Sequence, residues 1–185
     1  MLPPLVMNQQ AKVMRTASAM RGLEPQDPTE FDGIAFRDDT AREYNSNGSY
    51  KFSCLFMVTG LHTQPVNQAL FVASHLANRR VWLRETEKDI HWRDGAEDRA
   101  FTKIIWEPDL WYFLEIASDG KTLACKLIGP GGTKVQELPH CGSYEDKVRC
   151  VFGDTTIATA KHPFFGLLAD VCWFENRKLK YTWKP

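Results

Sequence analysis

The chain has 185 residues, of which 43% are hydrophobic and 12% are aromatic, and this composition suffices for one well-packed domain. Its 23 basic residues balance 23 acidic ones, which argues against a surface dedicated to nucleic acid or to an anionic membrane, because such surfaces show an excess of positive charge. No apolar run approaches the roughly 18–20 residues that a transmembrane helix needs, so we expect no membrane insertion.

The first 28 residues differ in composition from the rest of the chain. They are rich in Pro, Gln, Met and small residues, and they end in the stretch EPQDPTE, where two prolines stop regular structure. They lack the charged start and the apolar core of a secretory signal. We therefore interpret residues 1–28 as an extended N-terminal arm that docks onto other proteins of a larger assembly, and residues 29–185 as one domain.

From residue 31 onward the sequence consists of short β-type runs separated by turn residues. The first long run, YKFSCLFMV at 50–58, alternates with Phe52, Cys54, Phe56 and Val58 on one face. It is followed by QALFVASH, RRVWLRE, KDIHWRD, FTKIIW, LWYFLEIA, TLACKLI and KVQEL. The stretch SDGK at 118–121 predicts a hairpin, since Gly accepts the positive φ of a tight turn. No segment after residue 30 keeps a helical period, so we predict an all-β, antiparallel two-sheet sandwich.

The last long run, GLLADVCWFENRKL at 166–179, is apolar on both faces apart from one carboxylate, Asp170. Alternation places Leu168, Asp170, Cys172 and Phe174 on one face, and Leu167, Ala169, Val171 and Trp173 on the other. This pattern predicts an inner strand that is covered on both sides. The end of the run reads as a turn, in which Asn176 caps or takes a left-handed conformation and Leu179 returns to the core.

Four blocks of sequence carry a family resemblance. They are FDG at 31–33, YKFSCLFMV, EPDLWYFLEIASDGKTLACKLIG, and VFGDTTIATAKHPFFGLLADVCWFENRKL. Their order over residues 29–183 resembles the laminin-G-like, concanavalin-A-like jelly roll. The resemblance implies two curved antiparallel sheets, of which the concave one often forms a ligand groove. The family includes lectins, glycan-binding modules, adhesion domains and some glycan-cleaving enzymes, so the resemblance does not choose a function.

The same resemblance suggests a metal ion at Asp170. In many jelly rolls of this type the matching Asp binds a structural Ca²⁺ with backbone carbonyls near the start of the domain, which implies Asp32 and Gly33 as neighbours here. A hard cation takes six to eight oxygen ligands, and the sequence offers one convincing side-chain donor. In the alternative interpretation Asp170 accepts backbone N–H groups or pairs with an Arg.

Catalytic patterns are weak in this sequence, and we predict that the protein is not an enzyme. Glycan hydrolases of this fold carry Glu-x-Asp-x-x-Glu on one strand, and nothing here fits that pattern. Glu85 and Glu87 fall across a predicted turn, and Glu107 and Asp109 flank a proline in a predicted loop. The five histidines show no spacing typical of a zinc site.

A binding surface has more support. Trp82 shares a strand face with Arg80 and Arg84, and the next run brings either His91 and Arg93 or Ile90 and Trp92 inward. If the two runs pair as a hairpin, Trp82, Arg84, His91 and Arg93 form one surface, and Trp111 lies on a central strand as a further candidate. Aromatic faces stack on sugar rings, so this set resembles a glycan platform. In the alternative interpretation these aromatic side chains cover a sheet or fill a second face.

The cysteines and the arm bear on location and role. Five cysteines without a CxxC pair indicate free thiols, and Cys141 with Cys150 is the one plausible local pair. Lectin-type sandwiches usually act outside cells, yet no export signal is present. A phage or viral virion protein, made in the cytoplasm and released by lysis, satisfies both facts. We predict a non-catalytic virion component, such as a decoration, capsid-associated or tail protein. An intracellular complex subunit and a glycan or cell-surface recognition module are the alternatives.

Overall fold

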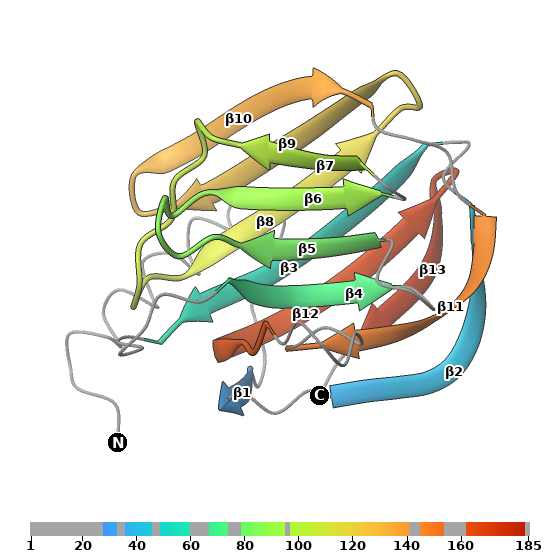
Figure 1. Cartoon of the computed structure of the whole chain (residues 1–185), viewed down its shortest axis with the longest axis horizontal. Coiled ribbons are helices and arrows are strands. Elements are labelled where there is room, and N and C mark those ends of the chain that lie inside the picture. Colours follow the sequence, from blue (N-terminus) through green and yellow to red (C-terminus); the bar gives the residue numbers. More distant parts are fainter. Residues whose placement is uncertain are drawn as a thin grey trace.

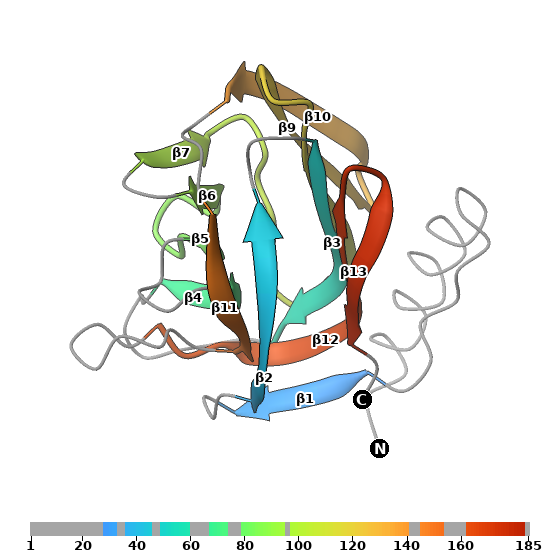
Figure 2. The ribbon, with the colours of Figure 1, turned by 90° about the vertical axis from the view of Figure 1, so that its right-hand side faces the viewer.

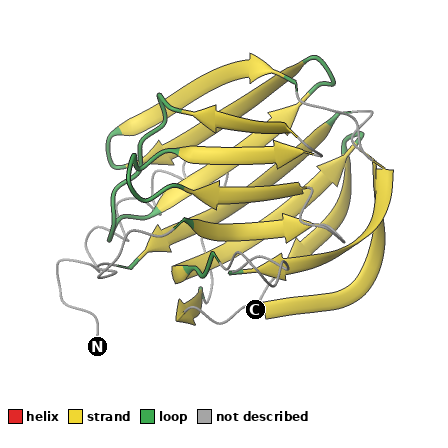
Figure 3. Cartoon of the chain, viewed as in Figure 1, coloured by secondary structure: helices red, strands yellow, loops and turns green. Residues whose placement is uncertain are grey.

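The computed structural model describes residues 28–32, 36–45, 49–59, 67–73, 79–94, 97–140, 145–153 and 162–183. These residues form thirteen strands and no helix (Figure 3). Consequently, none of them belongs to a helix that is long and apolar enough to cross a membrane. Every strand pair is antiparallel, which confirms the all-β prediction.

The strands form two sheets. Sheet A has the order β1 (Thr29–Asp32), β12 (Phe165–Glu175), β3 (Tyr50–Val58), β8 (Tyr112–Ser118), β9 (Thr122–Gly129) and β10 (Gly132–Pro139), and β13 (Lys178–Trp183) also pairs with β12. Sheet B has the order β2 (Phe36–Asn45), β11 (Glu145–Phe152), β4 (Gln68–Ala73), β5 (Arg79–Leu83), β6 (Ile90–Asp94) and β7 (Glu97–Phe101). In Figure 1, β4 to β7 lie in front of sheet A, and Figure 2 shows them beside β3 and β13. The predicted two-sheet sandwich is confirmed.

The core between the sheets is built largely from aromatic side chains. The Tyr50 ring stacks on both Trp92 and Trp173, with 5.6 Å between ring centroids in each pair. The Trp92 indole N–H donates a hydrogen bond of 3.1 Å to the Tyr50 hydroxyl. Phe52 of sheet A stacks on Phe71 of sheet B at 4.9 Å, so these rings join the two sheets. The alternation predicted for β3 is confirmed, since its even-numbered apolar residues all face this core.

Three cysteines, Cys54, Cys125 and Cys172, are free thiols. Cys54 and Cys125 are buried in the core and Cys172 is half-buried. Burial raises the pKa of the Cys54 and Cys125 thiols well above the ordinary value, which suits structural rather than reactive groups. Cys141 lies outside the described residues, so its pairing with Cys150 stays a prediction.

Two hairpin turns follow the turn chemistry of the sequence. Between β8 and β9, Gly120 has a φ of 89°, and an Asp119 carboxylate oxygen accepts hydrogen bonds from the N–H groups of Lys121 and Thr122. The predicted hairpin is confirmed. Between β12 and β13, Asn176 and Arg177 have φ values of 47° and 62°, as a two-residue turn of mirror-image type requires.

Strand β12 departs from the predicted alternation at Asp170. The pairing with β3 shifts between Ala169 and Cys172, and Asp170 has a φ of 50°, which together mark a bulge. The bulge turns Val171 and Trp173 to the same core as Leu168, so the predicted face assignment beyond residue 170 is wrong.

The predicted return of Leu179 to the core is also wrong. Leu179 is 52% exposed, because the two-residue turn sets it opposite Phe174 rather than opposite a core residue. Tyr181 pairs with Trp173 instead and fills the core position.

Candidate functional site

The outer surface of sheet B carries a cluster of polar and aromatic side chains on β5 and β6. Within this hairpin, Trp82 lies directly opposite His91, and Arg80 lies opposite Arg93. The residues between them, including Ile90 and Trp92, are fully buried in the core. Arg80, Trp82, His91 and Arg93 therefore face away from sheet A, and we name these four residues the β5–β6 face.

Trp82 lies at the centre of the β5–β6 face and is half-buried. The Arg80 guanidinium carbon lies 3.6 Å from the centroid of its ring, a cation–π contact. The His91 ring is tilted against it at 5.5 Å, and the His162 ring meets it edge-on at 5.4 Å. These contacts hold the indole in one orientation.

His162 was not predicted as part of this site. It reaches the β5–β6 face because its carbonyl accepts a 2.9 Å hydrogen bond from the N–H of Ala69 in β4, the strand beside β5. His162 lies about 80 positions after Trp82 in the chain, so no local pattern in the sequence indicates that the two residues meet.

Arg80 is the buried charge of the β5–β6 face. Only 7% of the residue is exposed, and its Nε atom has no hydrogen-bond partner among the described residues. Burial, and then the positive charge of Arg93, lower the pKa of Arg80 to about 10, although Asp98 acts in the opposite direction. Both effects show that the surroundings disfavour the charge that this guanidinium carries at neutral pH.

His91 lies between two carboxylates. Its Nε2 atom is 3.3 Å from an Asp89 oxygen, and its Nδ1 atom is 3.6 Å from an Asp98 oxygen. Neither ring nitrogen meets the geometry of a hydrogen bond with a described residue, although both are buried. The imidazole thus brings two buried polar atoms to the site without a described hydrogen-bond partner.

Arg84, predicted to join this surface, is engaged in the turn between β5 and β6. Its guanidinium donates two hydrogen bonds to the Asp89 carboxylate, of 2.9 and 2.6 Å, and lies 2.8 Å from Glu87. The bond to Asp89 raises the pKa of Arg84 above its ordinary value. Glu85 and Glu87 lie in the same turn, where the solvated hairpin tip was expected. Arg84 therefore closes the turn rather than pointing into the β5–β6 face.

Trp111 lies on the other sheet. It precedes β8 and belongs to a second apolar cluster on the face of sheet A turned away from sheet B, where it is 1% exposed. We name this set the outer cluster of sheet A; its members are Leu55, Met57, Trp111, Phe113, Ile128 and Ala169. The structure therefore does not bring Trp111 together with Trp82, and burial leaves it no open face for a ligand.

Two of the three residues considered for calcium, Asp32 and Asp170, lie at different positions along the β1–β12 part of sheet A. Asp32 is paired with Phe165, five residues before Asp170 on β12, which corresponds to about 16 Å along a strand. Gly33 lies outside the described residues. Among the described residues, no group of three or more His, Cys, Asp or Glu side chains could hold a metal ion. Asp32 thus does not fit a site at Asp170, and Asp170 remains a single candidate ligand.

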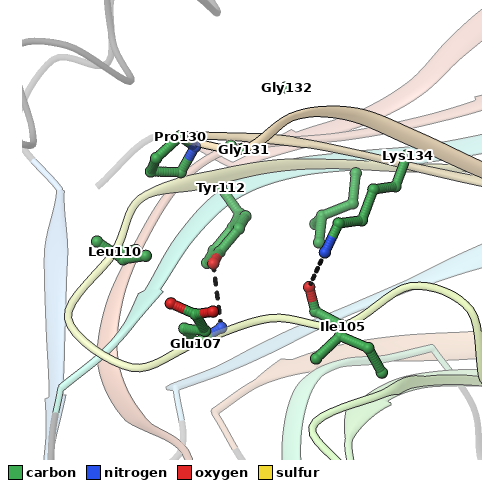
Figure 4. Close-up of a pocket in the computed structure, with 10 residues that line it drawn as sticks. Ile105, Glu107, Leu110, Tyr112, Pro130, Gly131, Gly132 and Lys134 are labelled. Atoms are coloured by element: carbon green, nitrogen blue, oxygen red, sulfur yellow. Dashed lines mark hydrogen bonds between the residues drawn. The ribbon is translucent and has the colours of Figure 1, made fainter.

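A small pocket lies between the segment 102–111 and the β9–β10 turn (Figure 4). The Tyr112 hydroxyl accepts a 3.0 Å hydrogen bond from the N–H of Glu107, and the Lys134 ammonium donates one of 3.0 Å to the carbonyl of Ile105. The Tyr112 hydroxyl and the Lys134 ammonium are thus already engaged within the fold. At about 200 Å³ the pocket is also smaller than the roughly 300 Å³ at which ligand sites begin, so it is the weaker candidate.

An open depression of about 350 Å³ lies beside the β12–β13 turn and includes Lys51, Phe174 and Arg177. The Lys51 ammonium lies 4.7 Å from the centroid of the Phe174 ring and 3.6 Å from Glu115. This half-buried aromatic ring under a cation is similar to Trp82 under Arg80, but its cation has a carboxylate partner.

No protein-family model and no curated protein sequence matches the chain. Solved structures do resemble it. A candidate carbohydrate-binding protein from Bacteroides ovatus shares 10% identity over 88% of this chain and 52% of its own, with a TM-score of 0.58. Domains LG4–5 of the mouse laminin alpha1 chain share 14% identity over 88% of this chain and 45% of their own, with a TM-score of 0.54. The enzymatically active domain of tailspike protein 2 from bacteriophage CBA120 shares 7% identity over 82% of this chain and 25% of its own, with a TM-score of 0.52.

These similarities establish the fold. The chain folds as a laminin-G-like, concanavalin-A-like β-sandwich, as its sequence motifs suggested. It spans about half or less of each of these three structures. Identities this low show a shared architecture and leave function to be argued from the site.

Proposed function

We propose that this protein is a non-catalytic recognition module that binds a saccharide on the β5–β6 face. The proposal rests on the position of Trp82. Its half-buried indole lies on the outward side of sheet B and is surrounded by Arg80, His91 and His162. An aromatic surface gives apolar contact to a sugar ring, while guanidinium and imidazole nitrogens hydrogen-bond its hydroxyl groups. The site combines both chemistries within one hairpin.

The packing of Trp82 supports this function. Three neighbouring rings and cations fix the indole, so little side-chain freedom is lost when a ligand binds. The β5–β6 hairpin is itself closed by the paired hydrogen bonds between Arg84 and Asp89. The sandwich thus presents the site on rigid strands, as a preorganised binding surface requires.

The fold neighbours also support recognition, at the level of architecture. One of them is a candidate carbohydrate-binding protein. We propose no catalytic role for the four carboxylates considered in the sequence, because they are not paired on one strand face as in the glycan hydrolases of this fold. Glu85 and Glu87 lie in the β5–β6 turn, and Glu107 and Asp109 are exposed in the segment before β8.

Glycan-array binding of the full chain tests the proposed function. We expect at least one glycan to bind, and Trp82→Ala to weaken that binding about tenfold to a hundredfold, because a central aromatic contact contributes about 1–3 kcal/mol. Phe174→Ala is the matched control, since it removes a half-buried ring under a cation on the other sheet. Melting temperatures of both variants separate lost binding from lost folding. Unchanged binding in a folded Trp82→Ala variant, or no bound glycan at all, would contradict the proposal.

A second candidate function is assembly, in which the sandwich is a structural component of a virion or another complex and residues 1–28 dock it. The outer cluster of sheet A favours this function, because a sheet face exposed to water normally carries polar side chains. Residue Thr29 pairs with Leu168, next to Ala169 of that cluster. The segment that precedes β1 therefore joins the body beside an apolar face that it could cover, in this copy or in a neighbour.

A further inference from the structure

We propose that the ligand of the β5–β6 face is an acidic sugar, in which a carboxylate or a sulfate on the ring pairs with Arg80 while the ring contacts Trp82. This inference rests on the proposed function and adds the class of ligand. It is carried by the charges of the site rather than by its aromatic ring.

The first argument is the positive charge of Arg80 on the β5–β6 face. Arg80 and Arg93 lie directly opposite each other in the ladder, and like charges at such positions repel. No described carboxylate forms a salt bridge with Arg80. Asp98 is 37% exposed and lies opposite Arg93 in the β6–β7 ladder, and Asp89 already accepts both hydrogen bonds from Arg84. An anion beside Arg80 would therefore balance a charge that Asp98 compensates only in part and that no described carboxylate pairs directly.

The second argument is the Arg80 donor that has no described hydrogen-bond partner. The residue is more than nine-tenths buried, yet its Nε has no described partner, and a buried donor without an acceptor is unfavourable. A guanidinium presents its N–H groups as a planar fork that matches the two oxygens of a carboxylate or sulfate. The stacking on Trp82 fixes the plane of this fork. A neutral hydroxyl could satisfy one donor but would leave the charge unbalanced.

The third argument concerns selectivity. The whole chain has no net charge, so it lacks the broad positive field that attracts any polyanion. On the β5–β6 face, Arg80 and Arg93 supply positive charge locally. We therefore expect recognition of a single acidic group on a ring rather than binding to polyanions in general.

An array of matched acidic and neutral glycans tests this inference with the full chain. The pairs are oligogalacturonates and their methyl esters, sialylated glycans and their asialo forms, and dextran sulfate and dextran. We expect at least one acidic glycan to bind at least tenfold more tightly than its neutral partner. The pair in which this difference occurs shows whether the recognised group is a carboxylate or a sulfate. Equal binding within every pair would overturn the acidic ligand and leave the proposed function standing. Absence of binding to any glycan would overturn both.

Variants at Arg80 assign the preference to this residue. Arg80→Gln should abolish the tenfold preference for the acid and retain binding of the neutral sugar. Lys103→Gln, which removes an exposed positive charge next to β7, is the control and should change neither. Arg80→Lys keeps the charge without the fork and should retain part of the preference, which keeps the test valid if Arg80→Gln folds poorly. A full preference for the acid in a folded Arg80→Gln variant would overturn the inference.

Discussion

The environment of Arg80 is unusual for an arginine. Its guanidinium is buried, opposite another arginine and without a described salt bridge, and its lowered pKa of about 10 reflects that environment. Unpaired buried charges are unfavourable for folding and tend to occur where function requires them. The contact with Trp82 offsets part of this unfavourable energy, and an anionic ligand would offset more.

The stability of Arg80→Met tests whether this charge is kept for binding. Methionine fills a similar space without the charge, so we expect a melting temperature equal to or above that of the natural chain, measured by circular dichroism. A residue retained for structure would behave in the opposite way. A clear fall in the melting temperature of Arg80→Met would show that Arg80 stabilises the fold.

Asp170 is the second unusual residue, and its calcium prediction has a direct test. A bound ion predicts that EDTA lowers the melting temperature, that excess Ca²⁺ restores it, and that Asp170→Asn removes this response. Asparagine has nearly the same shape and tolerates the left-handed φ of 50°, so the variant changes mainly the charge. Insensitivity of the natural chain to EDTA, with Asp170→Asn well tolerated, would favour a hydrogen-bonding role instead.

At the residue scale, strand alternation in the sequence was enough to group Trp82, His91 and Arg93. It could not indicate His162 or Asp89, because these residues reach the site through a contact with β4 and through a turn. Alternation also suggested Trp111 as a binding residue, because an outer sheet face gives the same alternation in the sequence whether it is buried or exposed. Only the placement of the two sheets separates Trp111 from Trp82.

At the scale of single elements, the turn between β12 and β13 gives a sharp prediction. Arg177 has a φ of 62°, a conformation that is unfavourable by about 1–2 kcal/mol for a residue with a side chain. Arg177→Gly removes that strain but adds about 0.4–1 kcal/mol of freedom to the unfolded chain. We expect a net stabilisation of about 0.5–1 kcal/mol in urea unfolding, because Asn-Gly is the preferred pair for this turn.

Arg177→Val is the matched control for this turn. A β-branched side chain is strained further at positive φ, so this variant should be less stable than the natural chain. If both variants had the same stability, the left-handed conformation at residue 177 would be contradicted.

The strands themselves differ in how well the sequence predicts them. β3 is regular, and its alternation correctly separates the core from the outer cluster of sheet A. β12 has the same apolar character, but one extra residue at the bulge near Asp170 reverses its alternation. A bulge depends on the backbone of a neighbouring strand, so an apolar pattern alone does not show where it falls.

At the scale of the whole molecule, the order of short motifs was sufficient for the two-sheet sandwich. Turn residues such as Gly120 and the alternation of β3 each constrain a small region, and together they leave few topologies. The division between arm and body was a prediction from composition, and residues 1–27 lie outside the described part of the chain. The alternative interpretation that aromatic side chains fill a second face holds for Trp111, but the full membership of the outer cluster of sheet A was not predicted, because the cluster forms from four strands or their flanks.

Deletion of residues 1–25 tests the second candidate function. The described core residues all lie at or after Phe31, so we expect the β-sheet signal in circular dichroism to survive. If the deleted segment covers the outer cluster of sheet A, the truncated chain should self-associate in sedimentation velocity and should fail to enter its assembly. Loss of the β-sheet signal would instead make this segment part of the core.

The most direct test of recognition at the β5–β6 face is to observe which side chains respond to a sugar. In a ¹H–¹⁵N NMR titration of the full chain with a galacturonate trimer, and with its methyl ester as the neutral comparison, the Trp82 indole and Arg80 Nε signals are the reporters, assigned with Trp82→Phe and Arg80→Lys. We predict that both signals shift in a saturable way with the acid and that the Arg80 signal shifts less with the ester. Saturable shifts confined to residues around Phe174 or Tyr112, with both reporters unchanged, would contradict recognition at this face.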